Sequence, residues 1–270
     1  FAIEPQTLAA ITQTLDVASL VAPERIHDEL VKMLASDQPS IGLDLMRQTG
    51  LLNLFIPELI TCIDVKQPEE FHNYDVYWHN LHACDAATKD NLSVRLAALL
   101  HDISKPACQV DLTFYNHEQV GADVAEQIMK RLRFGNQEIA KICNLIRQHM
   151  FNYTADWSDS AVRRFLRRIE GVANVPDLFA LRQADTLAMK PEINTNYLEE
   201  LQTRIDKIVA EENALDVKDL KINGSDVMAQ LQIPPGKKVG EILNALLEKV
   251  LDHPELNERE TLLKLITPSS

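Results

Sequence analysis

The segment RLAALLHDISKPA, residues 95–107, places an adjacent His101-Asp102 pair at the end of an apolar stretch. Comparable polar residues lie in other segments of helical periodicity, namely His79, His117, His149 and Asp185. Neutral imidazoles and carboxylates are ligands for Mn²⁺, Fe²⁺, Ni²⁺, Zn²⁺ or Mg²⁺. Taken singly, each is more often a solvated or hydrogen-bonded structural residue. Buried ionisable groups are costly unless they are paired or bind a metal, so convergence of these side chains would indicate a metal site.

Segments with helical periodicity must position these side chains. In residues 23–36, Pro23 suits a first helical position, and Ile26, Leu30 and Leu34 fall on one face. Gly50 is expected just beyond the end of the next helix. Further helices are predicted near residues 40–50, 77–88, 92–103, 117–133, 136–149, 159–169, 175–188, 195–213, 224–231 and 239–251. Because alternating β-branched runs are almost absent, we predict an all-α fold.

The composition is that of a folded, acidic protein. The 270 residues are 46% hydrophobic and 25% charged, with a net charge of −13. This charge argues against a protein that coats nucleic acid uniformly, although a local basic face stays open. No apolar run is long enough to span a bilayer, and FAIEPQTLAA lacks the features of a signal peptide. Four scattered cysteines disfavour a disulfide framework or a Cys-type zinc site and favour the reducing cytoplasm.

One window of the chain is basic. Residues 126–168 contain nine Lys/Arg and four Asp/Glu. Within it the pairs Arg163-Arg164 and Arg167-Arg168 recur at helical spacing, which predicts a ridge able to contact RNA phosphates. The alternative is a solvated helix face that pairs with neighbouring acids, and the residues alone favour that alternative.

The order His79, His101-Asp102 and Asp185 resembles the H…HD…D signature of the HD-domain metal-dependent phosphohydrolases. The motif HDISKP is similar to HD-x-G-K-P in that superfamily. The resemblance implies that these four residues hold a divalent metal, which would be Mn, Ni, Mg, Fe or Zn. It further implies catalytic roles for Asp102 and Lys105, with Lys105 near the substrate phosphate.

The same resemblance implies that His117 and His149 bind a second metal or the phosphate. Two departures from the family pattern are visible. Asn80 follows the first histidine, where a small hydroxyl residue is usual, and Ser104 replaces a common Gly. Neither change removes a ligand. Ser104 would matter only if its position required a positive φ, which Gly adopts freely.

The flanking segments resemble bacterial tRNA nucleotidyltransferases (CCA-adding enzymes) and their poly(A) polymerase relatives. ERIHDELVKML and GLDLMRQTGLLNLFIPEL resemble the neck of these enzymes, and DLKINGSDVMAQLQIPPGKKVGEILNALLEKVLDHPELNERETLL resembles their C-terminal region. The resemblance implies a helical neck at residues 1–62, a multi-helix HD metal-binding body at residues 63–190 and a tRNA-binding tail at residues 191–270.

Two activities follow as expectations from this resemblance. One is metal-dependent hydrolysis of 2′,3′-cyclic or 2′-phosphate substrates, and the other is a grip on tRNA during 3′-end CCA or A addition. The chain begins at Phe1 and contains no Gly-rich phosphate loop and no D-x-D pair, so the nucleotidyltransferase head is expected to be absent. The alternatives are a stand-alone HD phosphohydrolase and a tRNA-gripping scaffold with an idle metal site.

The expected partners are an RNA 3′ end, a phosphorylated nucleotide and the head in the parent protein. No membrane partner is expected. The native metal, the number of ions and homodimer formation stay open at this point.

Overall fold

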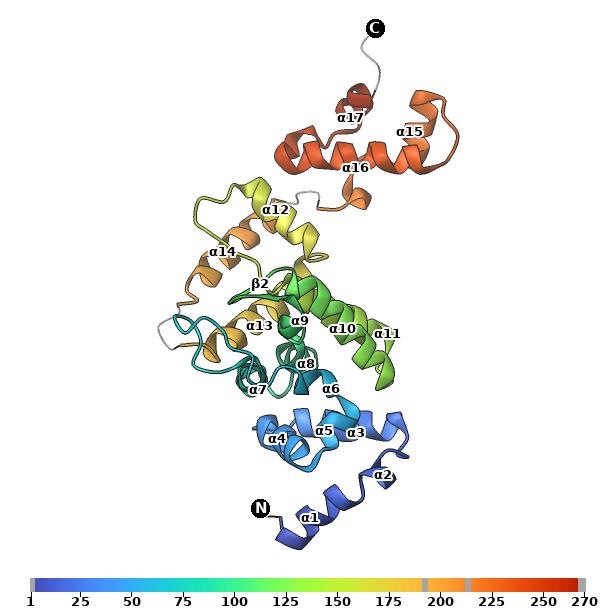
Figure 1. Ribbon diagram of the computed structural model, residues 1–270. Coiled ribbons are helices and arrows are strands. Elements are labelled where there is room, and N and C mark those ends of the chain that lie inside the picture. Colours follow the sequence, from blue (N-terminus) through green and yellow to red (C-terminus); the bar gives the residue numbers. More distant parts are fainter. Residues whose placement is uncertain (1–2, 191–193, 212–214, 267–270) are drawn as a thin grey trace. The chain divides into compact units, whose positions relative to one another are not determined.

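The computed structural model describes residues 3–190, 194–211 and 215–266 (Figure 1). Helices dominate this part of the chain, which confirms the predicted all-α class. The chain divides into two compact units, one of residues 1–151 and 176–195 and the other of residues 152–175 and 196–270. The three-part division into residues 1–62, 63–190 and 191–270 stays a prediction, and its second boundary meets residues 191–193, which lie outside the described residues.

The first unit begins with short helices. They are α1 (Pro5–Gln13), α2 (Leu15–Ala18), α3 (Pro23–Leu34), α4 (Pro39–Thr49), α5 (Leu51–Phe55) and α6 (Pro57–Ile60). Pro23 occupies the first turn of α3, as predicted. Gly50 follows α4 with φ 87°, a left-handed conformation that glycine adopts without strain, so this predicted helix end is also confirmed.

The remaining elements of the first unit follow α6 along the chain. They are α7 (Val76–Ala86), α8 (Leu92–Leu100), α9 (Lys105–Cys108), β1 (Gln109–Val110), β2 (Thr113–Phe114), α10 (His117–Arg131), α11 (Asn136–Gln148) and most of α13 (Val175–Leu187). Helix α8 contacts α7 and α11, and its residues from Val94 to Leu100 are all buried. Apart from Arg95, whose guanidinium donates to the Ala87 carbonyl, this segment is apolar, so the helix lies in the core and its end delivers His101 and Asp102 to the interior.

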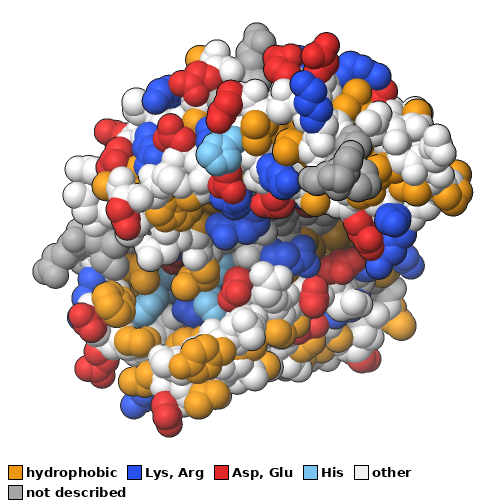
Figure 2. All heavy atoms as spheres, turned by 90° about the horizontal axis from the view of Figure 1, so that it is seen from above, with side chains coloured by type: hydrophobic (Ala, Val, Ile, Leu, Met, Phe, Trp, Pro, Cys, Tyr) orange, Lys and Arg blue, Asp and Glu red, His pale blue; other side chains and the backbone are white. Residues whose placement is uncertain are grey.

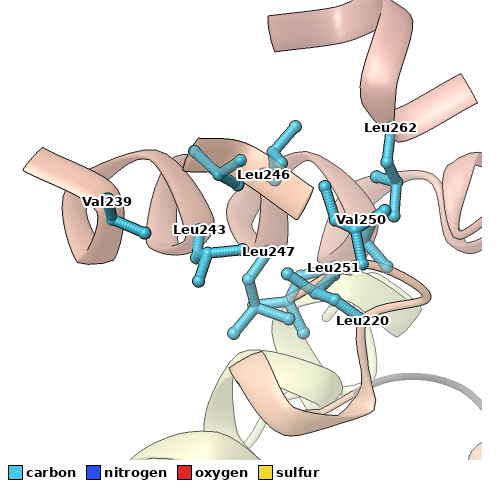
Figure 3. Packing of buried hydrophobic residues seen from close by; sticks show 10 residues of the cluster. Leu220, Val239, Leu243, Leu246, Leu247, Val250, Leu251 and Leu262 are labelled. Carbon is cyan, nitrogen blue, oxygen red and sulfur yellow. The ribbon is translucent and has the colours of Figure 1, made fainter. Parts of the chain in front are cut away.

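The second unit contains α12 (Asp159–Arg168), α14 (Tyr197–Ala210), α15 (Gly224–Leu231), α16 (Lys237–Asp252) and α17 (Arg259–Ile266), with the short 3₁₀ turns η1 (Val172–Asn174), η2 (Val217–Asp219) and η3 (Pro254–Leu256). The buried face of α16 packs against Leu220 and Leu262, as Figure 3 shows. Asn223 caps α15 by accepting hydrogen bonds from the amides of Ser225 and Asp226.

The helices predicted by range agree with the structure to within a few residues, but the short helices α1, α2, α5, α6, α9 and α17 were not predicted individually. The antiparallel pair β1–β2, joined through Gln109↔Phe114 and Val110↔Thr113, was not predicted. Two-residue strands are too short to show an alternating pattern, so periodicity does not reveal them.

Candidate metal centre

The six predicted His and Asp residues lie together in the first unit. His79 comes from the middle of α7, and Asp185 comes from α13. His101 is the C-terminal cap of α8 and His149 that of α11, while His117 begins α10. All six side chains are buried. The helices thus bring together residues that are separated by as many as 106 positions in the chain.

Four of these residues form a first group, consisting of His79, His101, Asp102 and Asp185. His79 Nε2 lies 3.2 Å from His101 Nε2 and 3.0 Å from Asp185 Oδ1. Asp102 Oδ2 lies 3.3 Å from His101 Nε2 and 3.6 Å from His79 Nε2. Ligand atoms about 2.1 Å from a divalent ion lie about 3.0–3.5 Å from one another. The first group therefore has the spacing of a metal coordination sphere.

A second group is formed by His117, His149 and the other oxygen of Asp102. The two Nε2 atoms are 3.4 Å apart, and Asp102 Oδ1 lies 3.2 Å from His117 Nε2 and 3.8 Å from His149 Nε2. Asp102 Oδ1 is buried and accepts no hydrogen bond from the described residues. A buried carboxylate oxygen without a donor is costly, and a cation would satisfy it. The Asp102 carboxylate thus presents one oxygen to each group.

Three of the histidines are oriented by backbone carbonyls. Nδ1 donates to the carbonyl oxygen three residues earlier in His101 (Ala98, 2.8 Å), His117 (Phe114, 2.7 Å) and His149 (Ile146, 2.7 Å). In a neutral ring, a proton on Nδ1 leaves the lone pair of Nε2 free for a metal, so metal binding at His101 would displace the Nε2 proton. This outer layer of hydrogen bonds fixes both the tautomer and the direction of each ring.

Electrostatics within the cluster favour a cation. Burial alone would lower the pKa of His101, but the Asp102 and Asp185 carboxylates raise it to about 10. Burial would raise the pKa of both aspartates, yet His101 and, for Asp102, Lys105 hold these pKa values well below their usual range. Burial and the charge of His101 lower the pKa of His149 to about 3. The carboxylates are therefore ionised and require positive partners.

Lys105 supplies one of these positive partners. Its Nζ lies 2.6 Å from Asp102 Oδ2 and donates to Gln67 Oε1 at 2.6 Å. The ammonium also lies 5.2 Å from the centre of the Phe114 ring. The resemblance placed Lys105 near a substrate phosphate, and the structure places it on the carboxylate that the two groups share.

Sequence reasoning missed two further side chains of this site. Arg182 Nη1 lies 3.4 Å from Asp185 Oδ2, and its Nη2 donates to the Phe151 carbonyl. It precedes Asp185 by three residues on α13, so helical spacing was the available signal. His72 contacts His79 edge to face, with ring centroids 5.0 Å apart. It comes from the loop before α7, where periodicity gives no guidance.

Five residues of the cluster line a cavity of about 470 Å³, namely His101, Asp102, His117, His149 and Asp185. His72, Lys105 and Arg182 also line it. Ser104 has φ −97°, so this position does not require Gly. Its hydroxyl donates to the His117 carbonyl at 2.7 Å and so connects the start of α10 to the start of α9. The Ser104 departure is thus compatible with the site.

The four predicted RNA-binding arginines lie on α12 in the second unit. Arg163 is buried and donates to the Leu251 carbonyl. Arg164 pairs with Glu248 and Asp252, and Arg167 pairs with Glu248. Arg168 is exposed and lies over the Phe165 ring. Three of the four arginines therefore contact α16, and two of them pair with its acidic side chains, as in the alternative to RNA binding in which this helix face pairs with neighbouring acids.

Figure 2 shows Lys and Arg side chains mixed with Asp and Glu over one face of the molecule.

Comparisons with known proteins match two parts of the chain to described families. Residues 112–266 match the family described as "tRNA nucleotidyltransferase domain 2 putative", and residues 1–62 match "Probable RNA and SrmB- binding site of polymerase A". The A-adding tRNA nucleotidyltransferase of Deinococcus radiodurans is 34% identical over 92% of this chain and 60% of its own length. The CC-adding tRNA nucleotidyltransferase of Thermus thermophilus is 31% identical over 85% of this chain and 53% of its own length.

The first match covers more than half of the chain. The chain therefore belongs to the tRNA nucleotidyltransferase family. It spans about 60% of the length of the Deinococcus relative and 53% of the Thermus relative. Within the described part of the chain, no helix is long and apolar enough to cross a membrane.

Proposed function

We propose that the His/Asp cluster is a phosphohydrolase site that binds two divalent cations. The observation that carries this proposal is the Asp102 carboxylate, which turns Oδ2 to the first group and Oδ1 to the second. In the first group the ligands would be His79, His101, Asp102 and Asp185. In the second they would be Asp102, His117 and His149. Bound cations of this kind polarise a phosphoryl oxygen and lower the pKa of bound water.

The remaining polar side chains of the cavity would bind and orient the substrate. Lys105 and Arg182 both line the cavity, and each carries a positive charge next to one of the aspartates. Their charges would attract a phosphate and offset negative charge that develops in the transition state. The buried floor restricts water to the open side of the cavity. Substrates with one phosphate, such as 2′,3′-cyclic or 2′-phosphate nucleotides, suit these dimensions.

The test is hydrolysis of 2′,3′-cyclic AMP by the purified chain with added Mn²⁺ or Ni²⁺. We expect turnover that EDTA abolishes and that Asp102→Ala removes. Asp123→Ala is the matched control, because Asp123 is exposed on α10 and pairs only loosely with Arg147 at 3.3 Å. Absence of turnover in a folded protein that has bound metal would overturn the proposal and leave the cluster with a structural role.

A second function, binding of tRNA, is favoured by the match of residues 1–62 to an RNA-binding family and by the tRNA nucleotidyltransferases among the relatives. Among the predicted arginines we assign the contact to Arg168, because it is exposed and the ion pairs of the described residues do not include it. Contacts with phosphates would make binding sensitive to salt.

Fluorescence anisotropy with labelled tRNA measures this binding. Arg168→Glu should weaken it, Arg168→Lys should largely retain it, and EDTA should leave it unchanged. Equal affinity of the Glu and Lys variants would exclude Arg168 from the contact.

We further propose that these 270 residues add no nucleotides by themselves, since the sequence contains no D-x-D pair. Extension of tRNA by the purified chain with CTP and ATP would contradict this.

A further inference from the structure

Three large apolar side chains at the mouth of the cavity are unusually exposed. Leu112 is 48% exposed, Tyr115 is 68% exposed and Met150 is 53% exposed, and all three line the cavity above the cluster. Single exposed apolar residues are common, but a group of them around a polar floor is typical of a ligand site. Figure 2 shows histidine side chains in a hollow next to hydrophobic side chains.

The backbone connects this apolar rim directly to the second group of the cluster. Tyr115 is two residues before His117, and Met150 directly follows His149. Asn116, between Tyr115 and His117, has φ 59°, a left-handed conformation that turns the chain sharply at this point. Phe114 packs on the Lys105 ammonium, and the neighbouring Tyr115 is exposed. A ligand whose phosphate reaches Lys105 and Arg182 would therefore meet Tyr115 and Met150 with its other end.

An adjoining cavity limits how many phosphate groups a bound ligand can carry. Its volume is 680 Å³, and it shares His72 and Leu112 with the first cavity. Its wall contains three carboxylates, from Asp64, Glu69 and Asp75, and one ammonium, from Lys66. A second phosphate on that side would face a net negative wall. The pair of cavities therefore favours a ligand that carries a single phosphate.

We propose that Tyr115 and Met150 bind the base of a nucleoside monophosphate, and that they determine the specificity of the cavity for nucleotides over other phosphate esters. This inference rests on the proposed phosphohydrolase function for the position of the phosphate. An aromatic ring stacks on any base, and a thioether makes favourable contacts with aromatic rings. The rim thus selects for a base without selecting strongly among bases.

Equilibrium binding of adenosine 2′-monophosphate to the EDTA-treated chain, measured by calorimetry, provides the test. Stacking on one aromatic side chain corresponds to about a 5- to 150-fold change in affinity. We expect a loss in this range for Tyr115→Ala, a smaller loss for Met150→Ala and near wild-type affinity for Tyr115→Phe. Val110→Ala is the matched control, because Val110 is 58% exposed on the same hairpin and does not line the cavity.

Ribose 5-phosphate, which has no base, separates recognition of the base from a general effect on the site. Its affinity should be equal in the wild type and in Tyr115→Ala. Equal losses for both ligands, or no loss for the nucleotide, would overturn the inference. Glycerol 2-phosphate hydrolysis with Mn²⁺ tests the phosphohydrolase function separately. Turnover of this ester together with base-independent binding would refute only the role of Tyr115 and Met150 in binding the base. Base-dependent binding without turnover would refute only the phosphohydrolase function.

Discussion

Replacement of Asp102 by Asn tests the central geometry, since Asn keeps the shape of the side chain but removes its charge. Each carboxylate oxygen faces a different group of ligands, so Asp102→Asn should weaken cation binding at both. Asp185→Asn should weaken binding only in the first group. Changes beyond the direct ligands commonly cost 10- to 100-fold in metal affinity, so loss of a charged ligand should cost about 100-fold or more.

The stoichiometry of bound Mn²⁺ distinguishes these variants. After desalting from a low concentration of Mn²⁺, elemental analysis should give about two ions for the wild type, about one for Asp185→Asn and nearly none for Asp102→Asn. One tightly held ion in Asp102→Asn would refute the reasoning, because it would show that one group functions without this carboxylate. Asp123→Asn, on the exposed face of α10, should bind as the wild type does.

The same substitution also changes stability without metal. Asp102 is buried, its Oδ2 lies 2.6 Å from Lys105 Nζ, and the pKa of the neighbouring His101 is raised to about 10. A buried ion pair that loses one partner costs about 3–5 kcal/mol. With a urea dependence of about 1–3 kcal/mol per M, the midpoint for the first unit should fall by about 1 M or more. An unchanged midpoint in EDTA would mean that the pair contributes no net stability.

Three further expectations concern packing and reactivity. Gly121→Ala should destabilise the first unit, because the added Cβ would lie 3.3 Å from the backbone oxygen of His101. Gly240→Ala should stabilise α16 by up to about 1 kcal/mol, because the added Cβ would meet no atom within 4 Å. Thermal unfolding of both variants measures this difference. Iodoacetamide at pH 8 should label Cys108 first, since the other three thiols are buried and burial raises the pKa of Cys84 to about 12; mass spectrometry that finds Cys84 labelled equally fast in the native protein would contradict this. Arg163→Ala should destabilise the second unit by about 1–3 kcal/mol, because it removes a buried donor to a backbone carbonyl, and an unchanged urea midpoint would exclude that role.

The helices were predictable because their apolar periodicity is strong. Helix α11 spans Asn136–Gln148, against a prediction of 136–149, and α12 spans Asp159–Arg168, against 159–169. The hairpin of β1 and β2 was not predictable by periodicity, since each strand has two residues. The hairpin matters for the site because it carries Tyr115 toward the cavity.

The candidate site was predictable only in part. Residue type identified the histidines and aspartates, and the family resemblance grouped them, but spacing alone does not bring His79 next to Asp185. Whether these side chains converge depends on tertiary packing, which the local sequence pattern does not encode. The same limit applies to Arg164, whose carboxylate partner Asp252 is 88 residues away.

His101 and His149 each end a helix as well as facing the cluster, and this has a consequence for how the site can evolve. The Nδ1–H groups donate to the Ala98 and Ile146 carbonyls in the last turns of α8 and α11, and the Ile146 carbonyl also accepts from the backbone N–H of His149. Aspartate at either position would place a second acceptor against the carbonyl, and cysteine would be too short to reach it. Exchange of a ligand type, the simplest route to a different metal, would therefore also remove a hydrogen bond at a helix end. The positions of His101 and His149 therefore favour a side chain that can donate from one nitrogen and bind a metal through the other.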